Sequence, residues 1–190
     1  MSHRASPLDR AVLAFSRCVL LVGLMAALPW QAQAQAPSIA VPSAYDEVSR
    51  LLRAKQLDQA LARAQDYLRT NPRDPHMRLL MGVTQNQKGD SAAALATFTS
   101  LTQENPELPE PHNNLAVLHA AAGRYDEARV ALEAALRANP GYAVALENLG
   151  DVYARLAERA WQRAQSLDAR NPRLAPKLQA VQGLLDTPTR

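Results

Sequence analysis

Cysteine is almost absent from this sequence of 190 residues, since Cys18 is the only one. The residue before it is Arg17, whereas a lipid-modified cysteine follows small residues, so we do not expect a lipoprotein. Because no other cysteine occurs, the chain after the N-terminal segment can form neither an internal disulfide nor a thiolate metal site. This composition is compatible with an oxidising compartment and does not require one.

Long hydrophobic runs are absent apart from one short segment near the N-terminus. Residues 18–28 (CVLLVGLMAAL) are apolar, but eleven residues are too few to span a bilayer comfortably. Arg4, Arg10 and Arg17 precede this segment, and alternating Ala and Gln residues come after it. This order predicts a secretory signal peptide over residues 1–36, and we expect cleavage after Ala34 or Ala36.

The signal peptide predicts an exported, periplasmic protein. The alternative is an uncleaved anchor over residues 11–28 that holds the chain at the inner membrane, although Arg17 interrupts that stretch. We expect residues 37–42 to form a linker and residues 187–190 a short tail.

Neither sign of charge dominates the rest of the chain. The sequence has 21 Lys and Arg against 18 Asp and Glu, and residues 1–36 hold three of the former and one of the latter, which leaves 18 basic and 17 acidic residues. No cluster of Lys and Arg with interleaved aromatics occurs, which argues against nucleic acid as a partner.

Aromatic residues are also scarce, at 5% of the chain, and no stretch alternates apolar and polar residues as a half-buried strand does. Apolar residues instead recur at helical spacing nearly throughout, and many of them are alanine. The pattern therefore predicts an all-α protein.

What the sequence does contain is a dipeptide that returns at a fixed interval. Asn-Pro occurs at 71–72, 105–106, 139–140 and 171–172, so that the prolines are 34, 34 and 32 residues apart. A period in this range is typical of repeat architectures.

One interval illustrates the repeated unit. Asp74 is a good helix N-cap, and Pro75 suits the first helical position, where a missing N–H costs nothing. Gly89 favours the left-handed conformation that ends a helix. A second helix, rich in Ala, comes next and stops at Pro106, because proline cannot continue the backbone hydrogen bonds. The unit is helix, tight turn, helix.

These features resemble the tetratricopeptide repeat family, whose 34-residue unit is a pair of antiparallel helices. The family has small residues at three fixed positions, larger apolar residues at four others and proline near the end. In the unit that starts at Pro75, Arg78 and Gln85 depart from this pattern, and in the next unit His112 and His119 replace large apolar residues. The matching residues of the first of these units are Met81, Gly82, Ala94, Phe98 and Pro106.

The resemblance implies an α-solenoid of antiparallel helix pairs. We expect about four repeats within a domain of residues 43–186, at about 41–74, 75–108, 109–142 and 143–173, with a capping helix at 174–186. The fourth repeat is two residues short and lacks a turn glycine in RLAERAW, so its turn is either very tight or replaced by one continuous helix. In that repeat we expect Gly150 to lie where the paired helices touch and leave no space for a larger side chain.

No arrangement of residues predicts catalysis. His112 and His119 share a helical face, but the further ligands of a metal site are missing, and we expect these side chains to fill core positions. No Gly-rich phosphate loop and no Ser/His/Asp arrangement is visible. We therefore expect no enzyme, no cofactor and no metal.

A partner-binding groove is the remaining candidate site. In the family, the first helix of each repeat lines a concave groove, mainly through five positions. Here these positions are apolar in the middle of the chain and acidic toward the C-terminus. The predicted groove residues are Tyr45, Arg53, His76, Leu79, Val83, Asn86, Gln87, Glu110, Asn113, Val117, Glu147, Asp151 and Arg155.

Such a groove suits an extended peptide or a helix of a partner. The leading hypothesis is a non-enzymatic scaffold or adaptor of the bacterial envelope, similar to small exported members of the family. The alternative is a structural subunit of a membrane-associated envelope complex. Peripheral association with a membrane through a partner and pairing with a second copy are left open. Trp161 either packs at the shortened turn or serves as an exposed anchor.

Overall fold

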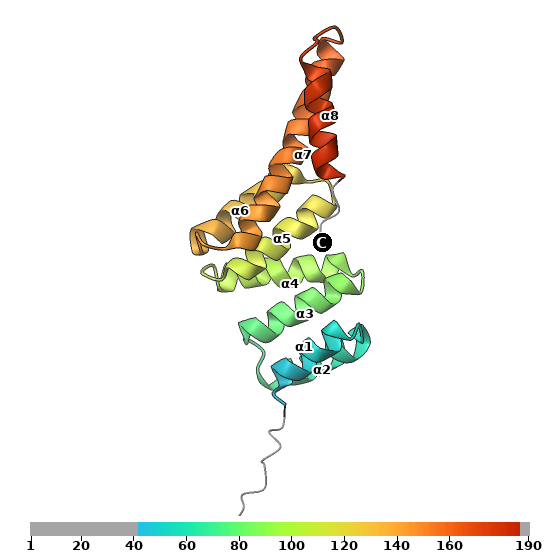
Figure 1. The fold of residues 1–190 in the computed structure, drawn as a ribbon. Coiled ribbons are helices and arrows are strands. Elements are labelled where there is room, and N and C mark those ends of the chain that lie inside the picture. The colour runs from blue at the N-terminus through green and yellow to red at the C-terminus, as the bar shows by residue number, and fades with distance from the viewer. Residues whose placement is uncertain (1–41, 187–190) are drawn as a thin grey trace, which may run out of the picture. The chain divides into compact units, whose positions relative to one another are not determined.

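The computed structural model describes residues 42–186, and this part of the chain folds into helices without a β-strand. The expected all-α repeat fold is confirmed. The predicted signal peptide and the tail at 187–190 lie outside the described residues. The helices are α1 (Ala44–Arg53), α2 (Leu57–Thr70), α3 (Pro75–Gln87), α4 (Ser91–Glu104), α5 (Pro109–Ala121), α6 (Tyr125–Ala138), α7 (Ala143–Leu167) and α8 (Leu174–Leu185) (Figure 1).

Polar side chains cap the first turns of several of these helices, and Asp74 does so as the sequence predicts. The Asp74 carboxylate accepts a hydrogen bond from the backbone N–H of Met77 at 2.9 Å, just ahead of Pro75. Asp90 accepts in the same way from Ala93 at 3.0 Å. Each bond satisfies one of the backbone donors that the first turn of a helix leaves without a partner.

In each of the first three repeats, one turn separates the two helices, and the three turns share a backbone conformation. Gly89 and Gly123 have positive φ angles of 87° and 71°. Lys55 occupies the same place in the first repeat with a φ of 57°. A side chain in this left-handed region costs roughly 1 kcal/mol relative to glycine. The turn geometry is therefore kept even where the sequence lacks the residue that favours it.

The helices pack in chain order. Each contacts its neighbours along the chain, and the first helices of successive repeats, α1, α3, α5 and α7, also contact one another. Among the described residues, α2, α4 and α6 have no such mutual contacts. We call α1, α3, α5 and α7 the first-helix layer. The family resemblance assigns the groove to the first helices. Their mutual contacts distinguish them from the second helices, which have none with one another among the described residues.

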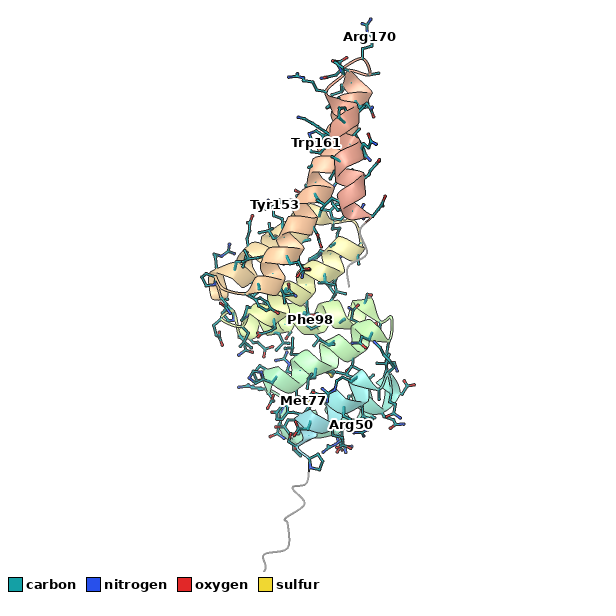
Figure 2. All side chains as sticks on the ribbon, viewed as in Figure 1. Arg50, Met77, Phe98, Tyr153, Trp161 and Arg170 are labelled. Atoms are coloured by element: carbon teal, nitrogen blue, oxygen red, sulfur yellow. The ribbon has the colours of Figure 1, made fainter. Side chains whose placement is uncertain are left out.

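Large buried side chains fill the spaces between helices, notably Met77 and Phe98 (Figure 2). Phe98 of α4 packs directly on Gly82 of α3, where an added Cβ would lie only 2.5 Å from the ring atom Cε1. A small residue at this point lets α3 and α4 approach closely.

The fourth repeat resolves the alternative left open by the sequence. Residues 143–167 form one continuous helix of 25 residues, with no turn at the place where the earlier repeats have one. The next residue in the 34-residue series after Lys55, Gly89 and Gly123 is Ala157, a strong helix former. The expected capping helix is present as α8, and within residues 42–186 it contacts only α7 (Figure 1).

The expectation for Gly150 is wrong. Its position corresponds to Gly82 two repeats earlier, yet it is exposed, and an added Cβ would have no neighbour within 4 Å. The reason is that the helix expected to fold back against it continues along α7 instead. Trp161 therefore lies in mid-helix rather than at a turn, half-buried, with the Lys177 ammonium 5.5 Å from its ring centre.

Candidate partner-binding groove

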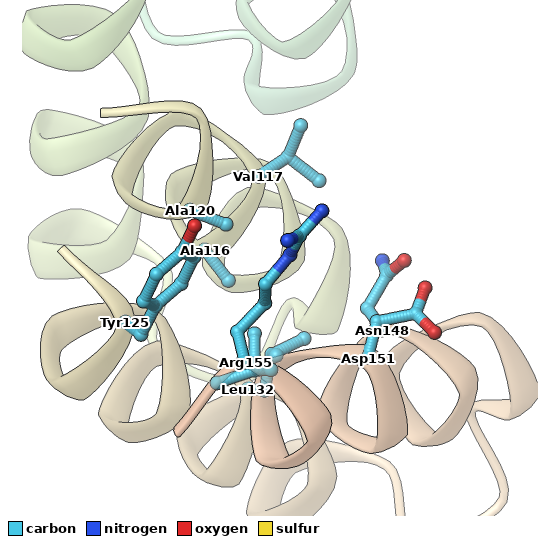
Figure 3. Close-up of a pocket in the computed structure, with 9 residues that line it drawn as sticks. Ala116, Val117, Ala120, Tyr125, Leu132, Asn148, Asp151 and Arg155 are labelled. Carbon is cyan, nitrogen blue, oxygen red and sulfur yellow. The ribbon is translucent and has the colours of Figure 1, made fainter. Parts of the chain in front are cut away.

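A pocket of about 300 Å³ lies between two members of the first-helix layer, α5 and α7, and α6 (Figure 3). Its apolar side chains come from all three helices, and its polar side chains come mainly from α7. Its lining consists of Ala116, Val117, Ala120, Tyr125, Leu132, Asn148, Asp151, Val152 and Arg155.

Two residues of opposite charge, Asp151 and Arg155, lie on the α7 side of this pocket. The Arg155 side chain extends from α7 toward Val117 of α5 (Figure 3). Asp151 lies on the preceding turn of α7. Within residues 42–186, the only ion pair of Arg155 is a long contact of 3.4 Å to Glu158, and Asp151 forms no salt bridge. Both charges are therefore accessible to a ligand over an apolar surface that includes the exposed Val117.

An amide pair fixes the distance between α5 and α7 beside the pocket. Asn148 donates to the side-chain oxygen of Asn113 at 2.8 Å. Asn113, a predicted groove residue, is 6% exposed, so its place in the structure is that of a link between helices. Glu110, one turn earlier, is half-buried. Burial and the charge of Glu110 raise the pKa of Tyr142.

At the other end of the repeats, the predicted groove residue Tyr45 takes part in a hydrogen-bond network. The Tyr45 hydroxyl donates to the carboxylate of Asp74 and lies 3.0 Å from the Tyr67 hydroxyl, which also bonds Asp74 at 3.2 Å. These bonds to the carboxylate raise the pKa of Tyr45. Burial acts to raise the pKa of Asp74, but the hydrogen bonds from Tyr45, Met77 and Tyr67 outweigh it and the pKa is lowered. The network joins α1, α2 and α3.

The pocket brings together only part of the predicted groove. It contains Val117, Asp151 and Arg155. The other predicted groove residues do not line the pocket, and all of them except Asn113 are exposed or half-buried on the first helices. They are Tyr45, Arg53, His76, Leu79, Val83, Asn86, Gln87, Glu110, Asn113 and Glu147. Among them, the Gln87 amide oxygen accepts a hydrogen bond from the Lys55 ammonium at 3.1 Å.

Sequence reasoning missed two pocket residues that carry polar atoms. Asn148 comes directly after the predicted Glu147, but it turns toward α5 because of its bond to Asn113. Tyr125 begins α6, a second helix, whereas the family pattern assigns the groove to first helices. A search for polar residues next to the expected positions would have found the former.

The two histidines have other partners. His112 Nε2 lies 3.2 Å from the Pro106 carbonyl oxygen, and His119 Nδ1 accepts a hydrogen bond from Arg124 at 3.1 Å. Burial and the neighbouring charge of Arg124 lower the pKa of His119, which favours its neutral form. Residues 42–186 contain no group of three or more His, Cys, Asp or Glu placed to hold a metal ion. In the same range, no helix combines the length and the apolar character needed to cross a membrane.

Comparison with known proteins gives partial matches to much longer chains. The sequence is 29% identical over 109 residues to human Superkiller complex protein 3, which covers 57% of this chain and 7% of that protein. It is 38% identical over 77 residues to the TPR repeat-containing thioredoxin TTL4 of Arabidopsis thaliana, covering 40% of this chain and 11% of the relative. The chain thus spans a small fraction of the curated relatives that it matches.

Solved structures share the fold at low sequence identity. The thermophilic TPR protein TTC0263 of Thermus thermophilus has a TM-score of 0.58 and 24% identity, over 75% of this chain and 81% of that one. The first TPR of Spaghetti (RPAP3), bound to the HSP90 peptide SRMEEVD, has a TM-score of 0.56 and 15% identity, over 60% and 90%. YrrB, described as a TPR protein with an unusual peptide-binding site, has a TM-score of 0.51 and 24% identity, over 55% and 54%.

Two family models match overlapping parts of the chain, residues 45–109 and residues 86–150, and both describe the tetratricopeptide repeat. Together they cover α1 to α6 and the start of α7, the part of the molecule in which the helix pairs and turns recur. The paired helices, the recurring turns and these matches show that the chain belongs to the tetratricopeptide repeat family, whose members generally serve as scaffolds for protein–protein interaction.

Proposed function

We propose that the protein is a scaffold or adaptor that binds a segment of a partner protein in the pocket between α5 and α7. The observation that carries this proposal is the pairing of an apolar surface with two accessible opposite charges, Asp151 and Arg155, on the first-helix layer. An extended peptide or a helix presents this combination, since it offers apolar side chains at regular spacing with charged neighbours.

Peptide binding by similar folds supports a protein partner. The RPAP3 repeat was solved with a peptide of HSP90, and YrrB is described by its peptide-binding site. Capture of a terminal carboxylate requires a pair of basic residues. The middle repeats of the predicted groove have no such pair and carry Leu79, Val83 and Val117 instead. We therefore favour an internal segment with an apolar anchor over capture of a terminal carboxylate.

We further propose that the protein works in the bacterial envelope after export to the periplasm. This proposal rests on residues 1–36, with their short apolar segment and small residues before the expected cleavage points. N-terminal sequencing of the protein recovered from the periplasm tests it, and a start at Gln35 or Pro37 is expected. Recovery of the uncleaved chain with the inner membrane contradicts cleavage and supports the anchored form.

A second candidate function is that of a structural subunit docked permanently in a membrane-associated envelope complex. Exposed apolar residues on α7 favour it, since Leu146 is 52% and Tyr153 is 49% exposed. Permanent interfaces bury apolar surface of this kind. The two functions differ in whether the partner is released on dilution.

The test is a crosslinked pull-down of the tagged protein from intact cells, with a charge-reversed pocket. Asp151→Lys with Arg155→Glu leaves the net charge unchanged and reverses both charges at the pocket. We expect recovery of the partner to fall at least tenfold. The matched control is Glu107→Lys with Arg137→Glu, which reverses two exposed charges away from the first-helix layer. Equal recovery with all three proteins would exclude the pocket as the binding site.

A further inference from the structure

The fourth repeat has an uncovered helix face that the other repeats cover. Val48, Gly82, Ala116 and Gly150 are spaced by 34 residues and occupy the same place on α1, α3, α5 and α7. The first three are buried against the second helix of their own repeat. Gly150 is exposed, because the segment that would form the second helix continues along α7.

The residues that would cover this face are exposed on the same helix. Allowing for the two missing residues, Ala160, Ala164 and Leu167 correspond to Ala128, Leu132 and Ala135 of α6. The three residues of α6 are fully buried against α5 and its neighbours. Ala160 is exposed, Ala164 is half-buried and Leu167 is 73% exposed. One α7 helix thus carries both halves of a helix–helix contact, and most residues of each half remain exposed.

The two halves form a single apolar stripe. Its residues succeed one another in steps of three and four, which places them on one side of a helix and gives the spacing of a two-helix seam. Every member is apolar, and small residues recur at every seventh position. The stripe consists of Ala143, Leu146, Gly150, Tyr153, Ala157, Ala160, Ala164 and Leu167.

The other sides of α7 are already occupied. Val152 is buried with residues of α5 and α6. On the far half of α7, the helix α8 buries Leu174, Leu178 and Val181, and α7 is its only contact within residues 42–186. These contacts leave six of the eight stripe residues exposed, while Ala157 and Ala164 are half-buried.

We infer that the stripe is the interface of a homodimer in which two α7 helices pack antiparallel across a two-fold axis near Ala157. In this arrangement the first half of α7 in one copy is covered by the second half of α7 in the other. Gly150 faces Ala164 of the second copy, Tyr153 faces Ala160, and Leu146 faces Leu167. The same antiparallel contact joins α3 to α4 and α5 to α6 within the chain, as the Gly82–Phe98 contact shows.

A second copy is the occupant that the residues favour, because it supplies the missing second helix with the correct side chains. A two-fold pair satisfies both halves at once and closes the assembly at two subunits. A connection too short to turn is also a known route to such exchange of elements. This interface lies outside the proposed peptide pocket, so the dimer and peptide binding stand or fall separately. It covers the Leu146 and Tyr153 surface on which the structural-subunit alternative rests, so the dimer competes with that alternative.

Sedimentation of the full chain over a range of concentrations tests the dimer. Leu146→Glu places a charge in the stripe, and the matched control Val130→Glu changes an equally exposed residue of α6, since the two are 52% and 53% exposed. We expect dimers for the parent and for Val130→Glu, and at least a tenfold weaker dimer for Leu146→Glu. A monomeric parent, or a dimer unaffected by Leu146→Glu, overturns the inference. Loss of a different protein from pull-downs with Leu146→Glu, while the parent is monomeric, assigns the stripe to that partner.

Disulfide crosslinking tests the direction of the helices in a Cys18→Ser background. We expect Gly150→Cys combined with Ala164→Cys to give a crosslinked dimer, and each single variant to give little. Two copies of residue 150 would lie about 20 Å apart in the antiparallel pair, from a rise of about 1.5 Å per residue. Crosslinked dimers from the single variants would indicate a parallel pair, and a disulfide within one chain would show that the fourth repeat folds back on itself. Either result overturns the proposed arrangement.

Discussion

At the scale of single residues, two glycines at equivalent repeat positions have different surroundings. Gly82 faces the ring of Phe98, whereas the space around Gly150 is empty in the described chain. Composition and period assign both to the contact between paired helices. The path of the chain many residues later separates them, because the fourth repeat fails to turn. The same small residue is therefore a packing requirement in one repeat and an exposed part of a helix in the other.

Alanine substitutions at these two glycines should change stability in opposite directions. We expect Gly82→Ala to destabilise the protein by about 1–3 kcal/mol, because the added methyl group displaces Phe98. We expect Gly150→Ala to stabilise it by about 0.5–1 kcal/mol, because alanine has the higher helix propensity. Denaturant unfolding measures both, in the Leu146→Glu background so that the proposed dimer does not contribute. A loss of stability at both positions would contradict the different surroundings of the two glycines.

The groove residues show where residue-level prediction stops. The family pattern identified Val117, Asp151 and Arg155 of the pocket, because they occupy regular positions on first helices. It could not tell that the Tyr45 hydroxyl and the Asn113 amide are engaged by neighbours. Those bonds depend on partners 22 and 35 residues away, whose side-chain directions are set by packing rather than by spacing.

At the scale of helices, an ion pair joins α3 to α4 where the family has an apolar contact. Arg78 donates to Glu104 at 2.7 Å and to Ser100 at 2.7 Å. The Arg78 side chain is only 13% exposed. Removal of Arg78 would leave the Glu104 carboxylate without its main partner. Hydrogen bonds from Arg78 and Ser100 lower the pKa of Glu104 to about 2.

This depressed pKa predicts a pH-dependent contribution to stability. The ionised Glu104 stabilises the folded chain at pH values above its ordinary pKa of 4.5, and this contribution is lost as the pH falls from there toward about 2. Glu104→Gln should therefore lower the melting temperature at pH 7, and the difference from the parent should shrink below pH 4. The exposed Glu107→Gln serves as the control, with no difference expected at either pH. A pH-independent difference for Glu104→Gln would show that its charge has no part in joining the helices.

The helix boundaries were largely readable from the sequence, and the fourth repeat shows why one was not. Asp74, Pro75, Gly89 and Gly123 are local signals, and the structure agrees with each of them. In RLAERAW no local residue stops a helix and none demands that it continue, so the choice depends on whether enough length remains to form a turn. The two missing residues and Ala157 favour the continuous helix.

At the scale of the whole described unit, contacts are made almost entirely between neighbours. The fold class could be predicted directly from the 34-residue period, because each helix pair can cover its apolar face only by stacking on the next. Where the last pair is not formed, an apolar face remains exposed on α7. Stability should accordingly be shared unevenly, with α8 dependent on a single neighbour.

Disrupting α8 should therefore leave the other repeats intact. We expect Leu178→Asp, at a side chain that is 8% exposed, to remove hydrogen-exchange protection from α8 and the far half of α7 only. Protection of α1 to α6 should change less than about twofold. Leu184→Asp, at a residue that is 63% exposed on the same helix, should leave the pattern unchanged. Loss of protection throughout residues 42–150 after Leu178→Asp would show that the repeats unfold as one unit.

The neighbour-only packing also bears on how the chain reaches its structure. Because no helix must find a partner more than two helices away, little loop closure precedes each favourable contact, and chains of this kind fold in roughly microseconds to milliseconds. One helix pair cannot cover its own apolar face, so stable structure begins once neighbouring pairs can stack, and it does not need the whole chain. Assembly can thus spread from pair to pair along the chain, and the apolar sides of α7 are covered last, by α8 and by the second copy proposed above.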